Sequence, residues 1–501
     1  MISDTRGVSL QGQTHGVHNK GEHAGSPLRT TIKRLNHQQL NDMDKTPFFH
    51  ALKIDEDTCI GCSHCMKICP TEALRVRDGK AMLIPDRCID CGNCFKVCPT
   101  HSIYVKQDDF EDIFNFPIRV ALIPSVFMGL FPNDITVSRI YSILKEIGFT
   151  HVIEAESSVP VYTAAKKKFT AENPDIKPLI STFCPAIVRL IQVKFPGLTE
   201  NLIPLRAPID ITAMYIRRKL KQDTELKDDQ IGIFYITPCA AKIAAVKNPV
   251  GEEKSLVDGV INMDSLYNRV YHEIKKQGKG YKEQKLPVSQ LSADSVLSSL
   301  TNGERRLSDA RHSYAIDEIH NVIEFLEKIE NEEIEDVDFL ELRACDQSCP
   351  GGILACDNRF LICERVFNRA RKIADRERKG EHTKDHELEE ERNYLMRNMK
   401  VGEIKPRSML VLDDNIAVAL EKMKKIDGYR ARLPQTDCGI CGAPTCDALA
   451  RDIVCDNAEL TDCVFIQRNL EARGNMDVHE SLKIMEVIWG RDKINDYVKK
   501  K

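Results

Sequence analysis

Residues 55–74 read DEDTCIGCSHCMKICPTEAL, and residues 85–103 read PDRCIDCGNCFKVCPTHSI. Each stretch carries four cysteines spaced Cys-x2-Cys-x2-Cys-x3-Cys, with a proline directly after the fourth, so the two stretches are copies of one unit. Each copy has an apolar, strand-like flank, a cysteine loop and a short helix. Three thiolates in one tight loop can surround one face of an iron–sulfur cube, and the fourth ligand must then come from elsewhere in the fold.

This spacing is the one found in bacterial ferredoxins with two clusters, where the fourth cysteine of each copy binds the cluster of the other copy. We therefore predict an α+β ferredoxin-like module over residues 47–108 that holds two [4Fe–4S] clusters. The first cluster is assigned to Cys59, Cys62, Cys65 and Cys98, and the second to Cys88, Cys91, Cys94 and Cys69. A four-cysteine zinc site is the alternative, but zinc motifs rarely place four cysteines within eleven residues twice over. Such a module indicates one-electron transfer without identifying a substrate.

The length and charge of the chain exclude several classes of protein. Its 501 residues suggest about three domains. Lys and Arg number 71 and Asp and Glu number 75, a net charge of −4 that provides no basic footprint for nucleic acid. The longest weakly polar run, residues 118–132, is too short for a membrane span, and no apolar signal segment is visible at the N-terminus. We expect a cytoplasmic protein whose polar residues 1–46 form a disordered tail.

The 19 cysteines are the most unusual feature of the composition. In a long chain without an export signal, clustered cysteines favour metal binding over disulfide bonds. Eight of them lie in the duplicated module, six are scattered between Cys184 and Cys363, and five lie between Cys438 and Cys463. The second and third groups are therefore candidate metal ligands as well.

Residues 115–375 have the pattern of an α/β domain with parallel sheets, because short apolar strands alternate with amphipathic helices. Strands are predicted at 120–127, 151–155, 178–182, 231–238 and 338–344, and helices around 140–147 and at 186–195. Three of these strands end at or beside Cys184, Cys239 and Cys345. Since ligands in parallel α/β folds bind beyond the carboxyl ends of the strands, we expect these cysteines to converge.

The third cysteine group lies in residues 438–463, which read CGICGAPTCDALARDIVCDNAELTDC. This stretch resembles the four-cysteine [4Fe–4S] module of corrinoid iron–sulfur proteins and of membrane electron-transport subunits. The resemblance assigns one cluster to Cys438, Cys441, Cys446 and Cys463, with Cys455 as the competing fourth ligand and zinc as the alternative metal. Around this small helical module, residues 431–470, we predict a charged helical linker at 376–430 and a helical tail at 471–501.

Four cysteines in three short segments connect the central domain to a known family. The segments are STFCPAIVRL (181–190), TPCAAK (237–242) and ACDQSCPGG (344–352). Together with the ferredoxin-like module ahead of them, they resemble the large catalytic subunit of [FeFe]-hydrogenases, whose signatures are TSCCP, PC-x-x-K and AC-x-x-x-C followed by glycines. The resemblance implies a two-lobed α/β hydrogenase domain over residues 115–375 in a multidomain α/β protein.

The resemblance also implies ligands for a further cluster and for a two-iron group. A [4Fe–4S] cubane is assigned to Cys184, Cys239, Cys345 and Cys349. Cys349 would also bridge to a two-iron subcluster with CO, CN⁻ and dithiolate ligands, and Lys242 corresponds to the lysine that hydrogen-bonds a cyanide ligand. These two are the candidate catalytic residues, while Gly351 and Gly352 match the glycines that let the backbone approach the cofactor. Three cysteines remain as structural or free thiols: Cys356, Cys363 and Cys455.

The implied activity is 2H⁺ + 2e⁻ ⇌ H₂ in an anaerobic iron hydrogenase, with evolution of H₂ from reduced ferredoxin as the expected direction. The electron partner is then ferredoxin or another redox protein, and maturation proteins must supply the two-iron cofactor. Two alternatives use the same motifs: an H₂ sensor with low turnover, and a non-catalytic iron–sulfur carrier or assembly factor of the Narf type. Direct use of NAD(P)H is disfavoured, because no G-x-G-x-x-G follows a strand.

Three departures from the family pattern mark the chain as divergent. The position before Cys184, where the family has a proton-relaying cysteine, is Phe183, whose ring cannot carry a proton. The paired glutamates of the usual proton path are not recognisable, and Glu154 and Glu156 are interpreted as ordinary carboxylates at a strand end. One residue fewer than in the common form separates Cys349 from its glycines. These changes predict slow turnover or a different proton route.

Overall fold

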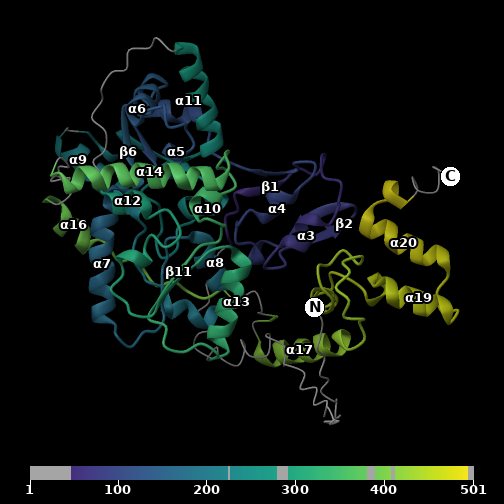
Figure 1. Cartoon of the computed structure of the whole chain (residues 1–501). Helices are drawn as coiled ribbons and strands as arrows, with labels where there is room; N and C mark the ends of the chain where they lie inside the picture. Colours follow the sequence, from purple (N-terminus) through teal and green to yellow (C-terminus); the bar gives the residue numbers. More distant parts are fainter. Residues whose placement is uncertain are drawn as a thin grey trace, which may run out of the picture.

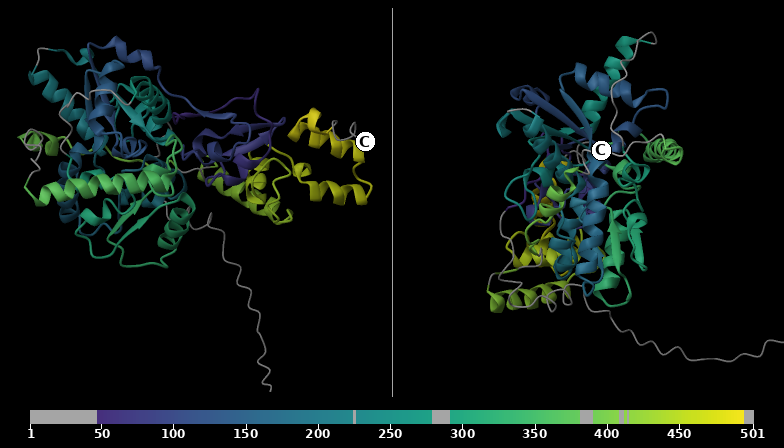
Figure 2. Two further views of the ribbon diagram at one scale, coloured as in Figure 1. Left: turned by 45° about the horizontal axis from the view of Figure 1, so that its top comes forward. Right: turned by 90° about the vertical axis from the view of Figure 1, so that its left-hand side faces the viewer.

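The computed structural model describes residues 47–223, 226–278, 291–380, 390–407, 412–413 and 415–494. The predicted disordered tail, residues 1–46, lies outside these ranges. The described chain forms three parts in a row: a large α/β domain, a small module from the first hundred residues, and a helical module at the C-terminal end (Figure 1). A second orientation shows the same order, with the small module in the middle (Figure 2).

The middle part follows the duplication seen in the sequence. Its elements are β1 (Leu52–Ile54), α3 (His64–Ile68), β2 (Leu74–Arg77), β3 (Lys80–Leu83), α4 (Asn93–Val97) and β4 (Ile103–Val105). The strand pairs β1–β4 and β2–β3 are both antiparallel. Each cysteine loop runs directly into α3 or α4, and these two short helices pack against each other. The predicted α+β module of ferredoxin type is confirmed.

The large domain contains two parallel sheets, as predicted. The first sheet has the strand order β6-β5-β8-β9. Its strands are β5 (Ile118–Ile123), β6 (His151–Glu154), β8 (Ile231–Thr237) and β9 (Gly259–Asn262). β8 is buried along its whole length, as expected for an inner strand of a parallel sheet. The strand predicted at 120–127 ends early, because Pro124 leads the chain into α5 (Ser125–Gly129).

The second sheet has the order β10-β11-β7. Its strands are β7 (Leu179–Ile180), β10 (Ser313–Ile316) and β11 (Phe339–Leu342), and both pairings are parallel. Apolar residues of β11 and of the helix at 185–194 share a core that is largely separate from the core under the first sheet. The domain is therefore two-lobed, with one sheet in each lobe.

Helices connect and cover the strands, and α6 and α8 lie where the sequence pattern predicts helices. They are α6 (Val137–Glu146), α7 (Val159–Glu172), α8 (Pro185–Lys194), α9 (Pro208–Asp223), α10 (Ala240–Lys247), α11 (Met263–Gln277), α12 (Ala293–Leu297) and α13 (Ile319–Glu330). The hydroxyl of Thr136 caps α6 by accepting from the backbone N–H of Arg139 at 3.1 Å. The apolar face of α6, with Ile140 and Leu144, is buried as the periodicity predicts.

The start of the predicted charged linker belongs to the large domain. Helix α14 (Arg359–Arg378) crosses the surface of that domain in Figure 1 and runs past the predicted boundary at residue 375. Its face with Ile362 and Val366 is buried against α5 and α12. The following α16 (Arg392–Arg397) packs against α7 and α9, and Val401 N–H donates to the carbonyl of Pro204. High charge along the sequence concealed this buried stripe, because its buried residues are spaced three or four apart among many charged ones.

The C-terminal part is a small helical module, as predicted. It consists of α17 (Ile416–Arg430), α18 (Cys446–Val454), α19 (Val464–Ala472) and α20 (Val478–Trp489). Its apolar core includes three cysteines, Cys441, Cys446 and Cys463. Across the described ranges, none of the helices combines the length and apolar character that spanning a bilayer requires.

Candidate iron–sulfur centres and reaction site

The folded module brings its cysteines together across the two copies. Burial, followed by the negative charges of Cys62, Cys59 and Cys98, raises the pKa of the Cys65 thiol to about 12. Cys98 thus lies with the three cysteines of the first loop, although it belongs to the second copy. In the same way Cys69, from the first copy, acts on the thiols of the second loop: Cys88, Cys91 and Cys94. These are the two predicted sets, and their assignment as cluster ligands stays a prediction.

The spacing of the sulfur atoms fits a polynuclear cluster better than a single ion. Four thiolates around one zinc ion would lie about 3.8 Å apart, given Zn–S bonds of about 2.3 Å. In the described part of the chain, the only metal-ligating trio within 4.8 Å of one another is His50, Cys88 and Asp90. The cysteine sets are more widely spaced than one ion requires. All 19 cysteines lie within the described ranges, and all are free thiols.

The C-terminal cysteines favour one choice of fourth ligand. Burial, with the charges of Cys463 and Cys438, raises the pKa of the Cys441 thiol to about 12, so these three lie close together. Cys446 begins α18 and shares their core. Cys455, the competing ligand, is exposed at the end of α18. The geometry therefore supports Cys463 over Cys455, and the ligand set itself stays a prediction.

The C-terminal module is docked on the ferredoxin-like module beside the first cysteine loop. Val76 N–H of β2 donates to the carbonyl of Gly442 at 2.9 Å, and a side chain at Gly442 would strike the Val76 carbonyl. Arg75, which is 1% exposed, donates to both oxygens of Asp452, at 2.5 and 3.0 Å. A side chain at Gly439 would touch Met66 of α3. The two groups of cysteines therefore belong to adjoining surfaces.

We expect Asp452→Ala to loosen this docking. The substitution leaves the buried guanidinium of Arg75 without its carboxylate, and a lost charge-assisted hydrogen bond costs about 1.5–3 kcal/mol. Limited proteolysis under anoxic conditions should release the C-terminal fragment faster from the variant than from the unmodified protein. Glu421→Ala, which changes an exposed carboxylate on α17 of the same module, is the matched control. Equal release rates from the two variants would contradict the expected role of Asp452.

The second cysteine loop faces the large domain instead. Lys96 of α4 donates to the carbonyl of Gly351 at 2.9 Å, two residues after Cys349. Asp90, between two of the loop cysteines, pairs with buried Arg189 of α8 at 2.6 Å. The same carboxylate lies 2.8 Å from His50 Nδ1 and accepts backbone N–H groups, so its oxygens are already satisfied. The carboxylate of Asp90 therefore has a structural role, and its pair with Arg189 joins the ferredoxin-like module to the large domain.

Four cysteines from the two sheets of the large domain converge at one point. Cys184 follows β7 and is the residue before α8, and Cys239 follows β8 and is the residue before α10. Cys345 follows β11, and Cys349 begins a short 3-10 turn. Burial and the charges of the other thiols raise the pKa of Cys239 to about 12, and they also raise the pKa of Cys345 well above its ordinary value. The expected convergence occurs, and it joins both lobes.

Two buried polar atoms at this point have no partner among the described residues. They are Nη1 of Arg343 and Oγ of Ser348. The charges of Cys349 and Cys184 act on Arg343, and Ser348 precedes Cys349 directly. An unpaired buried donor costs free energy unless an acceptor occupies the space beside it. A cluster with sulfide and thiolate acceptors would satisfy both groups, so the residues present fit such a cofactor.

Lys242 lies one helical turn after Cys239 and points at Cys349. Its Nζ is 3.7 Å from Cys349 Sγ and donates to the hydroxyl of Tyr235 at 3.2 Å. The ring of Phe183 lies beneath it, with the ring centre 4.8 Å from Nζ. Burial opposes the charge of Lys242, but Cys349, Tyr235 and Cys239 together raise its pKa above the ordinary value. Lys242 is thus a partly buried cation at the site, held against Cys349 and Tyr235.

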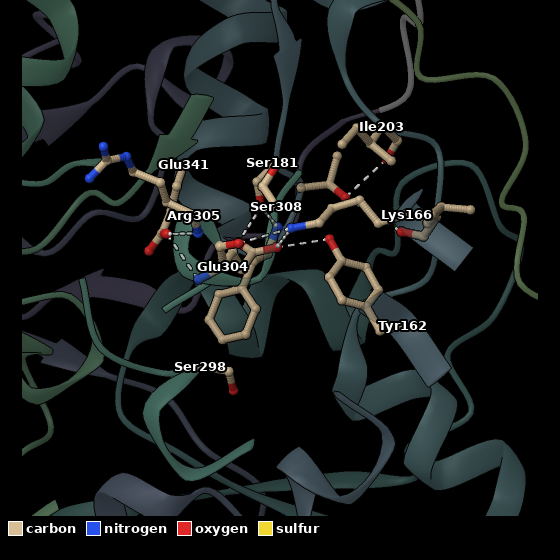
Figure 3. Close-up of polar contacts among 12 residues, drawn as sticks. Tyr162, Lys166, Ser181, Ile203, Ser298, Glu304, Arg305, Ser308 and Glu341 are labelled. Carbon is tan, nitrogen blue, oxygen red and sulfur yellow. Dashed lines mark hydrogen bonds and ion pairs between the residues drawn. The ribbon is translucent and has the colours of Figure 1, made fainter. Parts of the chain in front are cut away.

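Behind the cysteines lies a buried network of charged residues, drawn in Figure 3. Glu304 accepts from Tyr162 at 3.0 Å, from Ser181 at 2.6 Å and from Arg343 at 3.0 Å. Lys166, 3% exposed, lies 3.8 Å from the same carboxylate. Because Ser181 and Arg343 sit just before Cys184 and Cys345, the network fixes the two loops that present these cysteines.

Glu341 is the second carboxylate of the network and balances its charge. It accepts from the backbone N–H groups of Glu304 and Arg305 at 2.9 and 2.8 Å, as Figure 3 shows. It also pairs with Arg343 at 3.3 Å. Two cations and two carboxylates therefore meet with no water-exposed face, and Arg343 remains free to present one nitrogen to the cysteine site.

The glycines after Cys349 lie tightly against other parts of the chain's own backbone. A side chain at Gly351 would strike the carbonyl of Asp346, and one at Gly352 would strike the carbonyl of Pro238. The close approach is therefore made by the chain's own backbone. These contacts fold the 344–352 loop tightly onto the loop that carries Cys239.

A cavity of about 130 Å³ adjoins the cysteine site. Phe183, Tyr235 and Lys242 form one part of its wall, and the acidic side chains of Glu156, Asp210 and Glu252 line it as well. The sequence did not point to the last two, because neither stands in a motif or beside a cysteine. Asp210 lies in the first turn of α9, a position where aspartate is common, so its place in the sequence gives little sign of a role at the site.

The interpretation of Glu154 and Glu156 as ordinary strand-end carboxylates does not agree with their surroundings. Glu154 is fully buried and is held by Arg369 of α14 through two hydrogen bonds of 2.6 Å. Glu156 is 3% exposed and accepts from the N–H and hydroxyl of Ser125 at 2.9 and 3.1 Å. Burial, followed by the charge of Glu154, raises the pKa of Glu156 to about 7.

Three cysteines stand outside the predicted ligand sets. Cys356 and Cys455 are exposed, and Cys363 is buried in α14, where its thiol lies 3.7 Å from the amide oxygen of Gln347, in the loop between Cys345 and Cys349. Their interpretation as structural or free thiols stays a prediction.

Comparison with known families matches three segments of the chain. Residues 118–303 match the family described as iron only hydrogenase large subunit, C-terminal domain. Residues 51–108 match a 4Fe-4S dicluster domain, and residues 433–465 match a putative Fe-S cluster family. The three matches fall on the three parts that contain the cysteine sets.

Individual relatives are distant. The chain is 26% identical over 299 residues to the periplasmic [Fe] hydrogenase large subunit of Nitratidesulfovibrio vulgaris, covering 55% of this chain and 69% of that protein. Among solved structures, an [FeFe]-hydrogenase from Chlamydomonas reinhardtii is 12% identical, with a TM-score of 0.41, over 58% of this chain and 96% of the other. An [FeFe]-hydrogenase whose structure was studied for stepwise H-cluster assembly is also 12% identical, with a TM-score of 0.42. The match covers 60% of this chain and 97% of the other.

The fold and the cysteine centres together define an iron–sulfur protein built on a two-lobed α/β domain. The family matches confirm the resemblance found in the sequence. The matches together support a divergent [FeFe]-hydrogenase-like chain, with the family model covering residues 118–303.

Proposed function

We propose that the chain is an [FeFe]-hydrogenase that interconverts protons, electrons and H₂, with H₂ evolution from reduced ferredoxin as its physiological direction. The observation that carries the proposal is the meeting of four cysteines with Lys242 and a cavity. A cluster that only stabilised the fold would need the thiolates alone. A partly buried lysine beside Cys349, with space next to it, is what a second, two-iron group requires.

In this proposal the cubane is held by the four central cysteines, and Cys349 also holds the two-iron group. That group supplies the metal and the basic site at which protons and electrons combine. Lys242 provides a positive charge and a hydrogen-bond donor for a cyanide ligand. Phe183 and Tyr235 line the same space with aromatic rings. The unpaired nitrogen of Arg343 adds a second cationic donor beside the thiolates.

Three further [4Fe–4S] clusters would deliver electrons in a fixed order. The C-terminal module contacts the loop and helix of the first ferredoxin-type cluster, through Gly439 and Met66. The loop of the second cluster contacts the site of the cubane, through Lys96 and Gly351. The order that follows is the C-terminal cluster, the first cluster, the second cluster and then the cubane. Electrons would enter at the C-terminal end, farthest from the large domain in Figure 1.

The partners in this proposal follow from its chemistry. Ferredoxin or another small redox protein donates the electrons, and maturation proteins supply the two-iron cofactor. We propose no nucleic-acid partner, because the net charge of −4 offers no basic footprint. A cytoplasmic location is part of the proposal, since clustered reduced cysteines suit a reducing compartment.

The test is an infrared spectrum of anoxically purified protein from its native host, together with an assay of H₂ evolution from a reduced mediator. We expect metal-bound CO and CN⁻ stretching bands and measurable H₂ evolution. Bands without turnover would favour a sensor. Intact cubanes without bands, in cells whose maturation proteins are active, would favour an electron carrier or assembly factor and would overturn the proposal.

One contact favours the sensor as a second candidate. The ring of Phe183 lies between two cations, 3.8 Å from the guanidinium carbon of Arg343 and 4.8 Å from Nζ of Lys242, measured to the ring centre. It occupies the position at which the family has a proton-relaying cysteine. A stacked ring at this position slows proton delivery unless another group supplies the protons, which suits a protein that binds H₂ without rapid turnover.

A further inference from the structure

Three carboxyl groups line the cavity beside Lys242, those of Glu156, Asp210 and Glu252, and the chemistry described so far uses none of them. Glu156 reaches the cavity from the segment after β6, on the side of the first sheet. Asp210 reaches it from the first turn of α9. With Phe183 in the same wall, these carboxyl groups are side chains that can exchange protons in this part of the cavity.

The surroundings of Glu156 keep it in place and make it titratable. Ser125 donates to one carboxylate oxygen through its N–H and its hydroxyl, and the same hydroxyl lies 3.3 Å from Glu154. The charged and titratable groups that face Glu156 are Glu154, Lys242, Arg369 and Tyr235. Burial and the charge of Glu154 raise its pKa to about 7, while Lys242 acts in the opposite direction. Both protonation states are therefore accessible near neutral pH.

The surroundings of Asp210 also raise its pKa, through burial and a neighbouring carboxylate. The charged groups that face it are Glu252, which raises its pKa, and Arg206, which lowers it. Arg206 and Glu252 form an ion pair with one hydrogen bond of 2.6 Å, so most of the positive charge of Arg206 is directed at Glu252. Burial is the largest influence, and the pKa of Asp210 is raised to about 7. The side chain of Glu252 is 17% exposed and lines the same cavity, so the cavity reaches solvent beside Glu252.

We propose that Glu156 and Asp210 carry protons between solvent and the reaction site through this cavity, in place of the thiol that Phe183 replaces. The inference rests on the proposed function. The cavity of about 130 Å³ has room for several waters that can bridge the two carboxyls. For H₂ evolution, the Glu156 carboxyl gives its proton to the basic group at the reaction site and becomes a carboxylate. It regains a proton from Asp210 through water, and Asp210 regains one from solvent, so no electron moves in these steps.

The first test does not depend on hydrogenase activity. Protein that holds its cubanes but lacks the two-iron group is titrated by infrared difference spectroscopy through neutral pH. We expect carboxyl C=O bands that disappear with an apparent pKa of about 7. Glu156→Gln and Asp210→Asn should each remove one of them. Glu172→Gln, which alters an exposed carboxylate on α7, is the control and should change neither band. Absence of any carboxyl titrating near neutral pH would overturn the inference.

The second test uses the loaded protein. General acid–base groups contribute about 10²–10⁴-fold to rates, so Glu156→Gln should lower H₂ evolution by at least about 100-fold. Its metal-bound CO and CN⁻ bands should stay unchanged, and Glu156→Asp should restore part of the rate. A full rate in Glu156→Gln with the bands present would overturn the inference and leave the proposed function standing. If the unmodified protein shows neither bands nor turnover, the proposed function fails, and the carboxyl titration alone decides whether the two groups exchange protons.

Discussion

Replacing Cys349 with serine is expected to abolish H₂ evolution and to remove the metal-bound CO and CN⁻ bands. Cys349 Sγ lies 3.7 Å from Nζ of Lys242, and in the proposal this cysteine joins the cubane to the two-iron group. A serine hydroxyl is a much poorer ligand for iron than a thiolate, because it is hard to deprotonate. Loss of positioning groups around a metal already costs about 10–100-fold, so loss of the shared ligand should exceed about 100-fold.

The measurement compares Cys349→Ser with Cys356→Ser, an exposed cysteine seven residues further along the chain. Both proteins are purified without oxygen from cells with active maturation, and iron content, infrared bands and H₂ evolution are recorded. The variant at Cys356 should match the unmodified protein in all three. Unchanged activity in Cys349→Ser would rule out Cys349 as the bridging ligand.

The second large effect is expected on stability, from Glu304→Gln. This change leaves the buried cations Lys166 and Arg343 with one carboxylate, Glu341, in place of two. Breaking a buried ion pair by removing one partner destabilises a protein by about 3–5 kcal/mol, because the remaining charge has no water around it. The variant should therefore unfold at a clearly lower urea concentration than the unmodified protein.

The pH dependence of stability provides a further check on the same residue. Burial opposes the charge of Glu304, but Lys166 and Arg343 lower its pKa below the ordinary value of 4.5. A carboxyl with a lowered pKa in the folded state contributes stability above about pH 4.5 and loses it as the pH falls further. Glu304→Gln should lack that acid-dependent loss. Glu324→Gln, on the exposed face of α13, should shift neither the urea midpoint nor its pH dependence, and a shift equal to that of Glu304→Gln would contradict the assignment.

Sequence patterns predict the architecture well where one rule dominates. The duplicated cysteine spacing predicts a module with two crossed sets of thiols, and the fold brings Cys98 and Cys69 to the opposite loops. Short apolar runs predict β8 and β11 because inner strands of parallel sheets have few polar residues. The convergence of cysteines follows from the same reasoning, since the carboxyl ends of such strands form binding edges.

Sequence patterns fail where a residue depends on contacts that are distant along the chain. Glu156 resembles any carboxylate after a strand until Ser125, from the neighbouring strand's end, is seen to hold it. Arg343 is separated by about forty residues from Glu304, which decides its orientation. Helix α14 reads as a charged linker because its buried residues are spaced three or four apart among many charges. Each of these features becomes visible only when the two lobes are assembled.

The central cysteines have one more consequence. Cys239 follows a strand of the first sheet, whereas Cys184 and Cys345 follow strands of the second. A cluster bound by all three would cross-link the lobes as a disulfide joins two segments, and part of its binding free energy would become stability of their contact. The iron-free chain would then be the more open form, in which an assembly protein can reach the site. Oxidative loss of one cluster would separate both halves of the domain at once, so damage to the cofactor would also expose the protein to proteolysis.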